Sequence, residues 1–391
     1  MTIALTESIL QFGDPLGFKV RHGSERSPAI IGTGSDTFKV EARTLSGHQK
    51  EAIVTEGETG SVWRLASDEG KVMKGDDLAP FPLGYFNAGV MGDISNRTRR
   101  IANQRQLGLD RLRIRMSHLF GTDGSFVHST AKAYSETVEF RIEMDGALGL
   151  EEAGSLIEAA MDASPAIALL RRPMQENTFA LYINGRRREL ADHPNSSAQD
   201  AMDPFLAHKR PPRPSSGEPR NDLIRKCDVV ESGESPAVPL TSAQKRCFTI
   251  EAQGESRDQT GEFETDTWIG RPGMTHFRMI SDESDTDAAP SGLGLMSAGI
   301  GLCYLTQLQR YIDAQKLDIS AARLVQFTPF LTGAEGRCDA IDTHLFLNGQ
   351  APDEIHLNLL TIAARTCFMH VAASTALEPQ VTLVVNGQQV G

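Results

Sequence analysis

The sequence predicts an α+β protein built from two copies of one folding unit, because three observations agree. Residues 276–317 are an altered copy of residues 63–107, with FRMISDE matching WRLASDE. From Pro80 and Pro290 onward the two copies keep one offset of 210 residues (290 − 80 and 317 − 107). The chain has 391 residues, enough for two cores, and each copy alternates strand-like and helix-like patterns in the same order.

The first copy spans residues 38–186 and follows an arm, residues 1–37, whose Gly, Pro and Ser content predicts irregular structure. Three short alternating segments predict a strand meander. A helix is expected from Leu83 to about Gly108, because Pro82 suits a first helical turn. The later elements of this copy are expected as strands at 111–116 and 137–144, a helix over 151–170 that Ser164-Pro165 should kink, and a strand at 178–183.

Residues 187–239 have scattered Pro, Ser and charge without a period, which predicts a linker. The second copy, residues 240–391, repeats the order of the first. After its own strand meander, the expected elements are a helix over 293–316, strands at 322–328 and 339–347, a helix over 353–375 and a strand at 381–385. Each unit is therefore β-β-β-α-β-β-α-β, which predicts antiparallel sheets around central helices.

Composition argues against two classes of partner. The formal net charge is −12, whereas electrostatic binding of nucleic acid needs clustered Lys and Arg. No apolar run reaches the roughly 18 residues of a membrane span, and the N-terminus lacks the basic segment of a secretory signal. The five cysteines have no CxxC spacing, which fits a reducing cytoplasm with one or two functional thiols. We expect a cytoplasmic protein with no cofactor, nucleic-acid partner or membrane partner.

Two cysteines are candidates for chemistry. Cys303 lies in the first helix of the second copy among small apolar residues, and Cys367 lies at a similar depth in the second helix, so the thiols could face one another. The alternative is that both are buried small hydrophobic residues. A nucleophilic thiolate needs a nearby cation, for which the sequence offers Arg310, Arg257 and Arg278 without choosing among them.

The second copy resembles the OsmC/Ohr family, which comprises osmotically inducible protein C, organic hydroperoxide resistance proteins and their relatives. The resemblance lies in residues 276–303, with SDE before Ala289-Pro290 and SAGIGLC at the end, and in ARTCFMHVAASTALEPQVTLVVNG around Cys367. Members of that family form intertwined homodimers with two buried central helices. The resemblance therefore implies two tandem OsmC-like domains that make an intrachain pseudo-dimer.

The resemblance also implies a thiol-dependent peroxidase that reduces organic hydroperoxides and is regenerated by a dithiol reductant. Carried over by position, Cys303 attacks the peroxide oxygen and Cys367 resolves the sulfenic acid as a disulfide. Arg257 is the best match for the activating arginine. The family's Asn-Pro-Glu at the start of the helix is absent, because residues 289–291 read Ala-Pro-Ser and residues 79–81 read Ala-Pro-Phe.

The first copy departs from this pattern, since Asp93 stands in place of Cys303 (303 − 93 = 210) and Ser164 in place of the second cysteine. One interpretation is a degenerate half without a cysteine pair, with Asp93 paired to Arg97 or Arg100. The other is a buried carboxylate that acts as general acid or base, alone or with Cys303, in hydrolysis of a small apolar carbonyl substrate. Non-catalytic binding of a small apolar ligand is a third possibility, and a homodimer of the tandem chain is left open.

Two further groups have weaker signals. His370 follows Cys367 by three residues and is either a proton acceptor for that thiol or a packed histidine. Cys338, Asp342 and His344 share one face of a predicted strand, but we do not expect a metal there.

Overall fold

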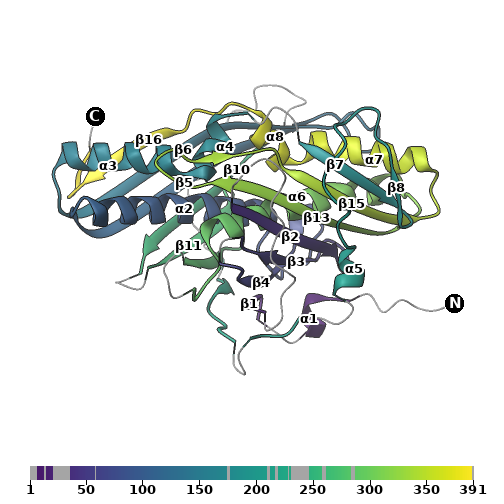
Figure 1. Cartoon of the computed structure of the whole chain (residues 1–391), viewed down its shortest axis with the longest axis horizontal. Coiled ribbons are helices and arrows are strands. Elements are labelled where there is room, and N and C mark those ends of the chain that lie inside the picture. Colours follow the sequence, from purple (N-terminus) through teal and green to yellow (C-terminus); the bar gives the residue numbers. More distant parts are fainter. Residues whose placement is uncertain are drawn as a thin grey trace.

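The computed structural model is an α+β fold of two sheets and several helices (Figure 1). It describes residues 7–12, 15–20, 36–57, 59–173, 177–208, 212–215, 219–227, 229, 246–257, 261–282 and 287–389. Much of the predicted arm and linker, and Glu283 of the second SDE motif, lie outside these residues.

Both copies contain the predicted β-β-β-α-β-β-α-β order. The first copy contributes β2 (Asp36–Thr44), β3 (Lys50–Thr55), β4 (Val62–Ser67), α2 (Pro82–Gln104), β5 (Gly108–Asp123), β6 (Lys132–Ala147), α3 (Leu150–Ala163), α4 (Pro165–Arg171) and β7 (Thr178–Ile183). The second contributes β10 (Arg246–Ser256), β11 (Glu262–Ile269), β12 (Phe277–Asp282), α6 (Gly292–Gln315), β13 (Ile319–Leu331), β15 (Asp342–Gly349), α7 (Asp353–Thr366), α8 (Phe368–Ser374) and β16 (Gln380–Val385).

Short elements occur in segments that were expected to be irregular. The predicted arm contains α1 (Ile9–Phe12) and β1 (Gly17–Lys19), and the predicted linker contains β8 (Arg186–Arg188), α5 (Pro204–Ala207) and β9 (Ile224–Lys226). The remaining short elements are η1 (Lys71–Met73), β14 (Arg337–Cys338) and β17 (Gln388–Gln389). Because β9 pairs with β12 and α5 packs on β2 and β13, the described part of the linker lies against the sheets.

Each sheet mixes strands of both copies. The first sheet has the order β1-β4-β3-β2-β13-β15-β7-β8, with β14 paired to β13, and the second has β9-β12-β11-β10-β5-β6-β16-β17. The meander of one copy thus continues into the long strands of the other, through β2 with β13 and β10 with β5. Strands from both sides of the predicted boundaries near 186 and 240 therefore share each sheet.

The sheets are mixed, which corrects the expectation of purely antiparallel sheets. β15 pairs in parallel with β7, and β6 pairs in parallel with β16. In both pairs the two strands come from different copies. No tight turn has to join them, so parallel pairing is open to them.

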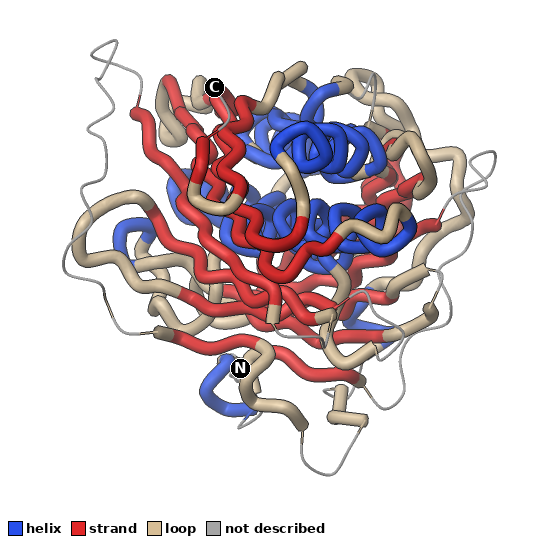
Figure 2. The backbone as a smooth tube through the Cα atoms, turned by 90° about the vertical axis from the view of Figure 1, so that its left-hand side faces the viewer, coloured by secondary structure: helices blue, strands red, loops and turns tan. Residues whose placement is uncertain are grey.

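The two central helices, α2 and α6, cross in opposite directions and hold the sheets together. Figure 2 shows the helices in the middle of the molecule with strands curving around them. A Cβ atom on Gly292 would lie 2.5 Å from the backbone nitrogen of Asp93, and one on Gly299 would lie 2.7 Å from that of Phe86. Glycine is therefore required where the two backbones approach. Most of α6 is buried on all sides, as its largely apolar sequence from Gly292 to Leu305 predicts.

Both second helices break at the same place. α3 and α4 are separated by Ser164, and α7 and α8 by Cys367. The bend of 77° between α3 and α4 confirms the kink predicted at Ser164-Pro165, since proline lacks the N–H that would continue the helix. Ser164 and Cys367 are therefore equivalent positions. Within the described residues no single helix meets the length and apolarity needed to cross a membrane, and only this bent pair meets them jointly.

Candidate functional site

Cys303 and Cys367 meet where α6 contacts α8. Cys303 is buried in the middle of α6, and Cys367 is the buried residue between α7 and α8. Both thiols are free, and each lies close enough to the other to shift its pKa. The two thiols therefore face one another, as formation of a reversible disulfide requires.

The two thiols have opposite pKa shifts. Burial acts to raise the pKa of Cys303, but hydrogen bonds from the Cys367 thiol and from the backbone N–H groups of Met369 and Phe368 outweigh it, and the pKa falls below its ordinary value. Burial, together with the hydrogen bond to Cys303 and the charge on it, raises the pKa of Cys367 well above its ordinary value. Cys303 is consequently the thiol that ionises first.

A histidine contacts the second thiol. His370 Nδ1 lies 3.2 Å from Cys367 Sγ, and burial lowers the pKa of His370 to about 4. The ring is therefore neutral at pH 7, and one of its nitrogens can accept a proton. Its Nε2 atom is buried and has no hydrogen-bond partner in the described part of the chain. His370 also lines a cavity of about 360 Å³, together with His193 and Arg365.

A different cavity, of about 340 Å³, reaches Cys303. Its walls come from both copies and are largely apolar. The apolar side chains of this cavity are Val72, Met73, Phe81, Pro82, Leu83, Phe248, Ile250, Ile269 and Phe368. The polar ones are Glu69, Thr122, Arg246, Arg271, Thr306, Gln307 and Arg310. A small apolar molecule with one polar end fits this lining.

Arg310 is the cation that α6 itself brings to the cavity. Its guanidinium donates to Gln307 Oε1 at 2.9 Å and lies 3.7 Å from the centre of the Phe126 ring. Burial lowers the pKa of Arg310, and the charges of Glu69 and Cys303 act in the opposite direction. The guanidinium therefore interacts with the Cys303 charge across the cavity wall, where screening by water is reduced.

Glu69 is a site residue that the sequence did not identify. Its Oε1 atom accepts a hydrogen bond from Thr306 Oγ1 at 2.6 Å, one turn from Cys303 on α6. Glu69 ends the SDE motif of the first copy, so the first copy supplies a carboxylate to the thiol cavity of the second. The repeated motif was visible in the sequence, but the exchange of strands between copies was not.

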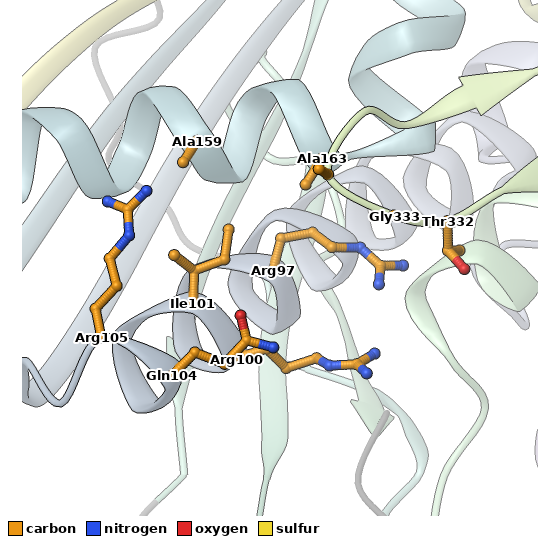
Figure 3. Close-up of a pocket in the computed structure, with 10 residues that line it drawn as sticks. Arg97, Arg100, Ile101, Gln104, Arg105, Ala159, Ala163, Thr332 and Gly333 are labelled. Atoms are coloured by element: carbon orange, nitrogen blue, oxygen red, sulfur yellow. The ribbon is translucent and has the colours of Figure 1, made fainter.

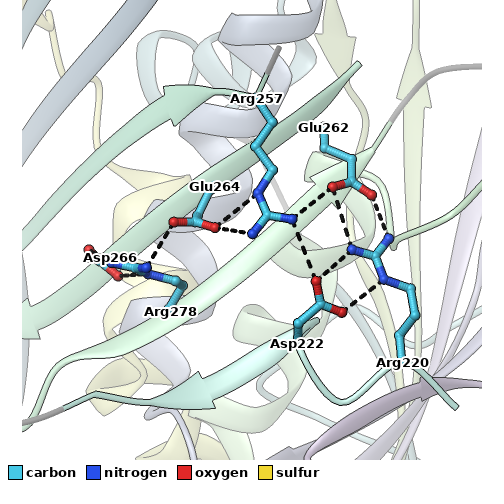
Figure 4. A network of polar contacts seen from close by, with 7 residues as sticks. All are labelled: Arg220, Asp222, Arg257, Glu262, Glu264, Asp266 and Arg278. Carbon is cyan, nitrogen blue, oxygen red and sulfur yellow. Dashed lines mark hydrogen bonds and ion pairs between the residues drawn. The ribbon is translucent and has the colours of Figure 1, made fainter. Parts of the chain in front are cut away.

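Arg257 does not lie at this site, which corrects its assignment as the activating arginine. It binds Glu264 at 3.0 Å and Glu262 at 3.1 Å, in a ladder of opposite charges that also holds Arg278 (Figure 4). Ile250 lines the thiol cavity near the start of β10, and Arg257 comes seven residues later, about 23 Å along the strand. Arg310 and not Arg257 therefore lies in the cavity with Cys303.

Asp93 is also distant from Cys303. The backbone nitrogen of Asp93 lies against Gly292, and Cys303 follows Gly292 by 11 residues on α6, about 16 Å along the helix axis. The shared Asp93 and Cys303 site considered for a hydrolase therefore does not form.

Asp93 instead has four hydrogen-bond donors around it. Its Oδ1 accepts from Arg97 Nε at 3.0 Å and Nη2 at 2.8 Å, and its Oδ2 accepts from Ser164 Oγ at 2.5 Å and the Ala166 nitrogen at 3.3 Å. Arg97 is one of the two partners expected for a degenerate half. Asp93 and Ser164 touch just as Cys303 and Cys367 do, so the first half keeps the geometry of the pair without its thiols.

The strand with Asp342 and His344 has a hydrogen-bonding role. Ser196 Oγ donates to Asp342 at 2.8 Å, and Tyr182 Oη lies 3.2 Å from His344 Nδ1. The Ser196 contact fastens the segment after β8 to the first sheet, and the Tyr182 contact lies within that sheet, between β7 and β15. In the residues that the structure describes, no three His, Cys, Asp or Glu side chains are grouped so as to hold a metal ion.

Comparison with known proteins gives one weak similarity. No family model and no curated protein matches the chain. A solved structure, an OsmC-like hydroperoxide resistance protein from Jannaschia sp. CCS1, is 18% identical and has a TM-score of 0.24. The matched region covers 36% of this chain and 95% of that protein.

Proposed function

We propose that this chain is a tandem OsmC-like protein and a thiol-dependent peroxidase of small apolar organic hydroperoxides. One observation carries the proposal: two buried free thiols lie together where α6 meets α8, and one of them, Cys303, lines a largely apolar cavity. Cys303 lines the cavity and Cys367 does not, so we assign attack to Cys303 and resolution to Cys367; the lowered pKa of Cys303 agrees, because a thiolate is the nucleophilic form of cysteine.

The proposed reaction has three steps. Cys303 Sγ attacks a peroxide oxygen, the O–O bond breaks, and the alcohol leaves with the proton that the Cys303 thiol gives up, which leaves a sulfenic acid. Cys367 Sγ then attacks Cys303 Sγ, the disulfide forms, and water leaves with the Cys367 proton. A dithiol reductant restores both thiols and is itself oxidised to a disulfide.

The cavity residues fit this chemistry. The apolar walls bind the organic part of the hydroperoxide, and burying apolar area contributes about 25 cal/mol per Å². Arg310 favours the Cys303 thiolate by its charge, and Glu69 fixes Thr306 at the neighbouring turn. His370 relays the Cys367 proton to the hydroxide that leaves as water in the second step, because its Nδ1 is the base in contact with that sulfur.

The first copy has a supporting role in this proposal. It completes both sheets and contributes Glu69 to the cavity, while Asp93 and Ser164 replace its cysteines. All five cysteines are free in the structure, which supports work in a reducing cytoplasm.

The test is consumption of cumene hydroperoxide with dithiothreitol as reductant, for the wild type, Cys303→Ser and Cys338→Ser. Cys338 lies outside both cavities that adjoin the thiol pair and serves as the matched control. We expect turnover in the wild type and in Cys338→Ser, and none in Cys303→Ser. Equal activity of the wild type and Cys303→Ser would remove the proposal.

A further inference from the structure

The first half has its own cavity, of about 510 Å³, between α2, α3 and the loop after β13. Figure 3 shows its side chains: Arg97 and Arg100 extend from α2 toward Thr332, while Arg105 stands at the other end beside Ala159. No acidic side chain of the described residues lines it. The cavity therefore presents three guanidinium groups in a chain whose formal net charge is −12.

This cavity is related to the thiol cavity by the repeat. Arg97 and Arg100 stand at the positions of Gln307 and Arg310 (307 − 97 = 210 and 310 − 100 = 210). Thr332 corresponds to Thr122 at the same offset, and Thr122 lines the thiol cavity. The first half has thus gained a guanidinium where the second half has a neutral amide.

The exchange of cysteine for Asp93 explains how the added arginine is held. Asp93 Oδ1 accepts from two Arg97 nitrogens, and Ser164 and Ala166 fix the other oxygen. This arrangement fixes the direction of the Arg97 side chain along the cavity wall. Asp93 is a positioning residue in this view, and it neutralises one of the three positive charges.

The remaining charge is available to a ligand. Arg100 makes no hydrogen bond or ion pair with any residue that the structure describes, and Arg105 donates only to the uncharged groups of Ser155. A guanidinium binds a carboxylate or phosphate through two parallel hydrogen bonds. Ile101 and Ala159 add an apolar wall between the two ends of the cavity.

We propose that this cavity binds a small organic anion, with an oxyanion head group at Arg97, Arg100 and Thr332 and an apolar body against Ile101 and Ala159. The inference does not involve the thiol pair and goes beyond the peroxidase proposal. Carboxylate and phosphate share the chemistry that the guanidinium groups recognise, and they differ in charge and shape.

The test is titration calorimetry of the full chain at low ionic strength with two probes, inorganic phosphate and butyrate. Arg100→Ala removes a lining guanidinium, and Arg99→Ala, a neighbour on α2 that does not line the cavity, is the matched control. We expect one site per chain for at least one probe. Arg100→Ala should weaken it about tenfold, and Arg99→Ala should leave it unchanged, because one charge-assisted bond is worth about that factor.

Each outcome decides the proposal. Binding of phosphate, of butyrate or of both with the expected loss in Arg100→Ala supports it and identifies the head group. Absence of binding for both probes, or equal weakening by the two substitutions, would overturn it, because equal weakening indicates attraction to the helix surface in general. Hydroperoxide turnover is measured separately with Cys303, so failure here leaves the peroxidase proposal unaffected.

Discussion

The two halves of this chain put different chemistry on one framework. In the second half a helix residue and the residue at a helix break are Cys303 and Cys367, two buried thiols that lie close together. In the first half the equivalent residues are Asp93 and Ser164, which are joined by a hydroxyl-to-carboxylate bond of 2.5 Å. The same two positions contact each other in both halves. Their side chains determine whether the half holds a pair of thiols or a buried carboxylate.

The difference also shows how each half accommodates buried polarity. A thiol pair is nearly apolar when protonated and needs no ion partner. A buried carboxylate needs one, and Arg97 supplies it from the next turn of α2. The substitution of cysteine by aspartate is therefore coupled to the presence of arginine four residues later.

The largest expected difference between the halves is in turnover. Cys303→Ser should lower hydroperoxide consumption by more than about a thousandfold, because the hydroxyl of serine is not ionised at neutral pH. Asp93→Ser, at the equivalent position, should change the initial rate per folded molecule less than about threefold. Steady-state consumption under dithiothreitol, corrected for folded protein by circular dichroism, measures both. A large loss of rate in folded Asp93→Ser would contradict the division of roles.

The free energy of unfolding should depend more on Asp93 than on Cys303. Asp93→Ala leaves the buried Arg97 charge without its partner and should lower the free energy of unfolding by about 3–5 kcal/mol. Cys303→Ala removes one small buried group and should cost about 1–2 kcal/mol. Urea unfolding of the two variants gives the comparison. If Asp93→Ala is the milder change, Arg97 must find water or another partner, and the coupling described above is wrong.

The start of the central helix also differs between the halves. Ser291 caps α6 and donates to Glu56 Oε1 at 2.9 Å, whereas Phe81, the residue before α2, provides no side-chain cap. Burial raises the pKa of Glu56 to about 7 from an ordinary value of 4.5, against the opposing effect of the Ser291 hydrogen bonds. The folded state therefore binds this proton more tightly than the unfolded state does.

Glu56 makes the folded protein more stable at low pH than at high pH. The stabilisation from protonated Glu56 is fully present below pH 4.5 and is lost as the pH rises through about 7, a change of roughly 3 kcal/mol. Glu56→Gln should flatten the wild-type decline of stability between those pH values. Urea midpoints at pH 5 and pH 8 test this, with Glu354→Gln on exposed α7 as the control. Parallel pH profiles for wild type and Glu56→Gln would contradict it.

The smallest expected effect is that of His370, which should influence disulfide formation and not the oxidation of Cys303. His370→Asn should leave the rate of Cys303 oxidation unchanged and slow disulfide formation about tenfold, because the base that contacts Cys367 Sγ is lost. Quenching the reaction at successive times with dimedone, which traps the sulfenic acid, measures how fast the sulfenic acid forms and how fast it is converted to the disulfide. His193→Asn, which alters the same cavity without touching Cys367, is the control. Equal slowing in both variants would assign His370 a packing role only.

Sequence reasoning succeeded where the information was local. The order of elements, the break at Ser164-Pro165 and the pairing of Asp93 with Arg97 all follow from spacing along one helix or one segment. It failed where contacts depend on how far apart the strands place their residues and on which copy supplies them. Arg257 is the best match by position, yet it follows Ile250 of the cavity by seven residues and lies just beyond the end of β10, and Glu69 comes from the other copy.

The central claim is that Cys303 and Cys367 form a peroxide-driven redox pair. The direct measurement is peptide mass mapping of the reduced protein after one equivalent of cumene hydroperoxide, without added reductant. The account predicts one new cross-linked peptide that joins Cys303 to Cys367, lighter by two hydrogen atoms and restored by dithiothreitol. An unmodified Cys303 thiol, or a Cys303 oxidised without a link to Cys367, would contradict it.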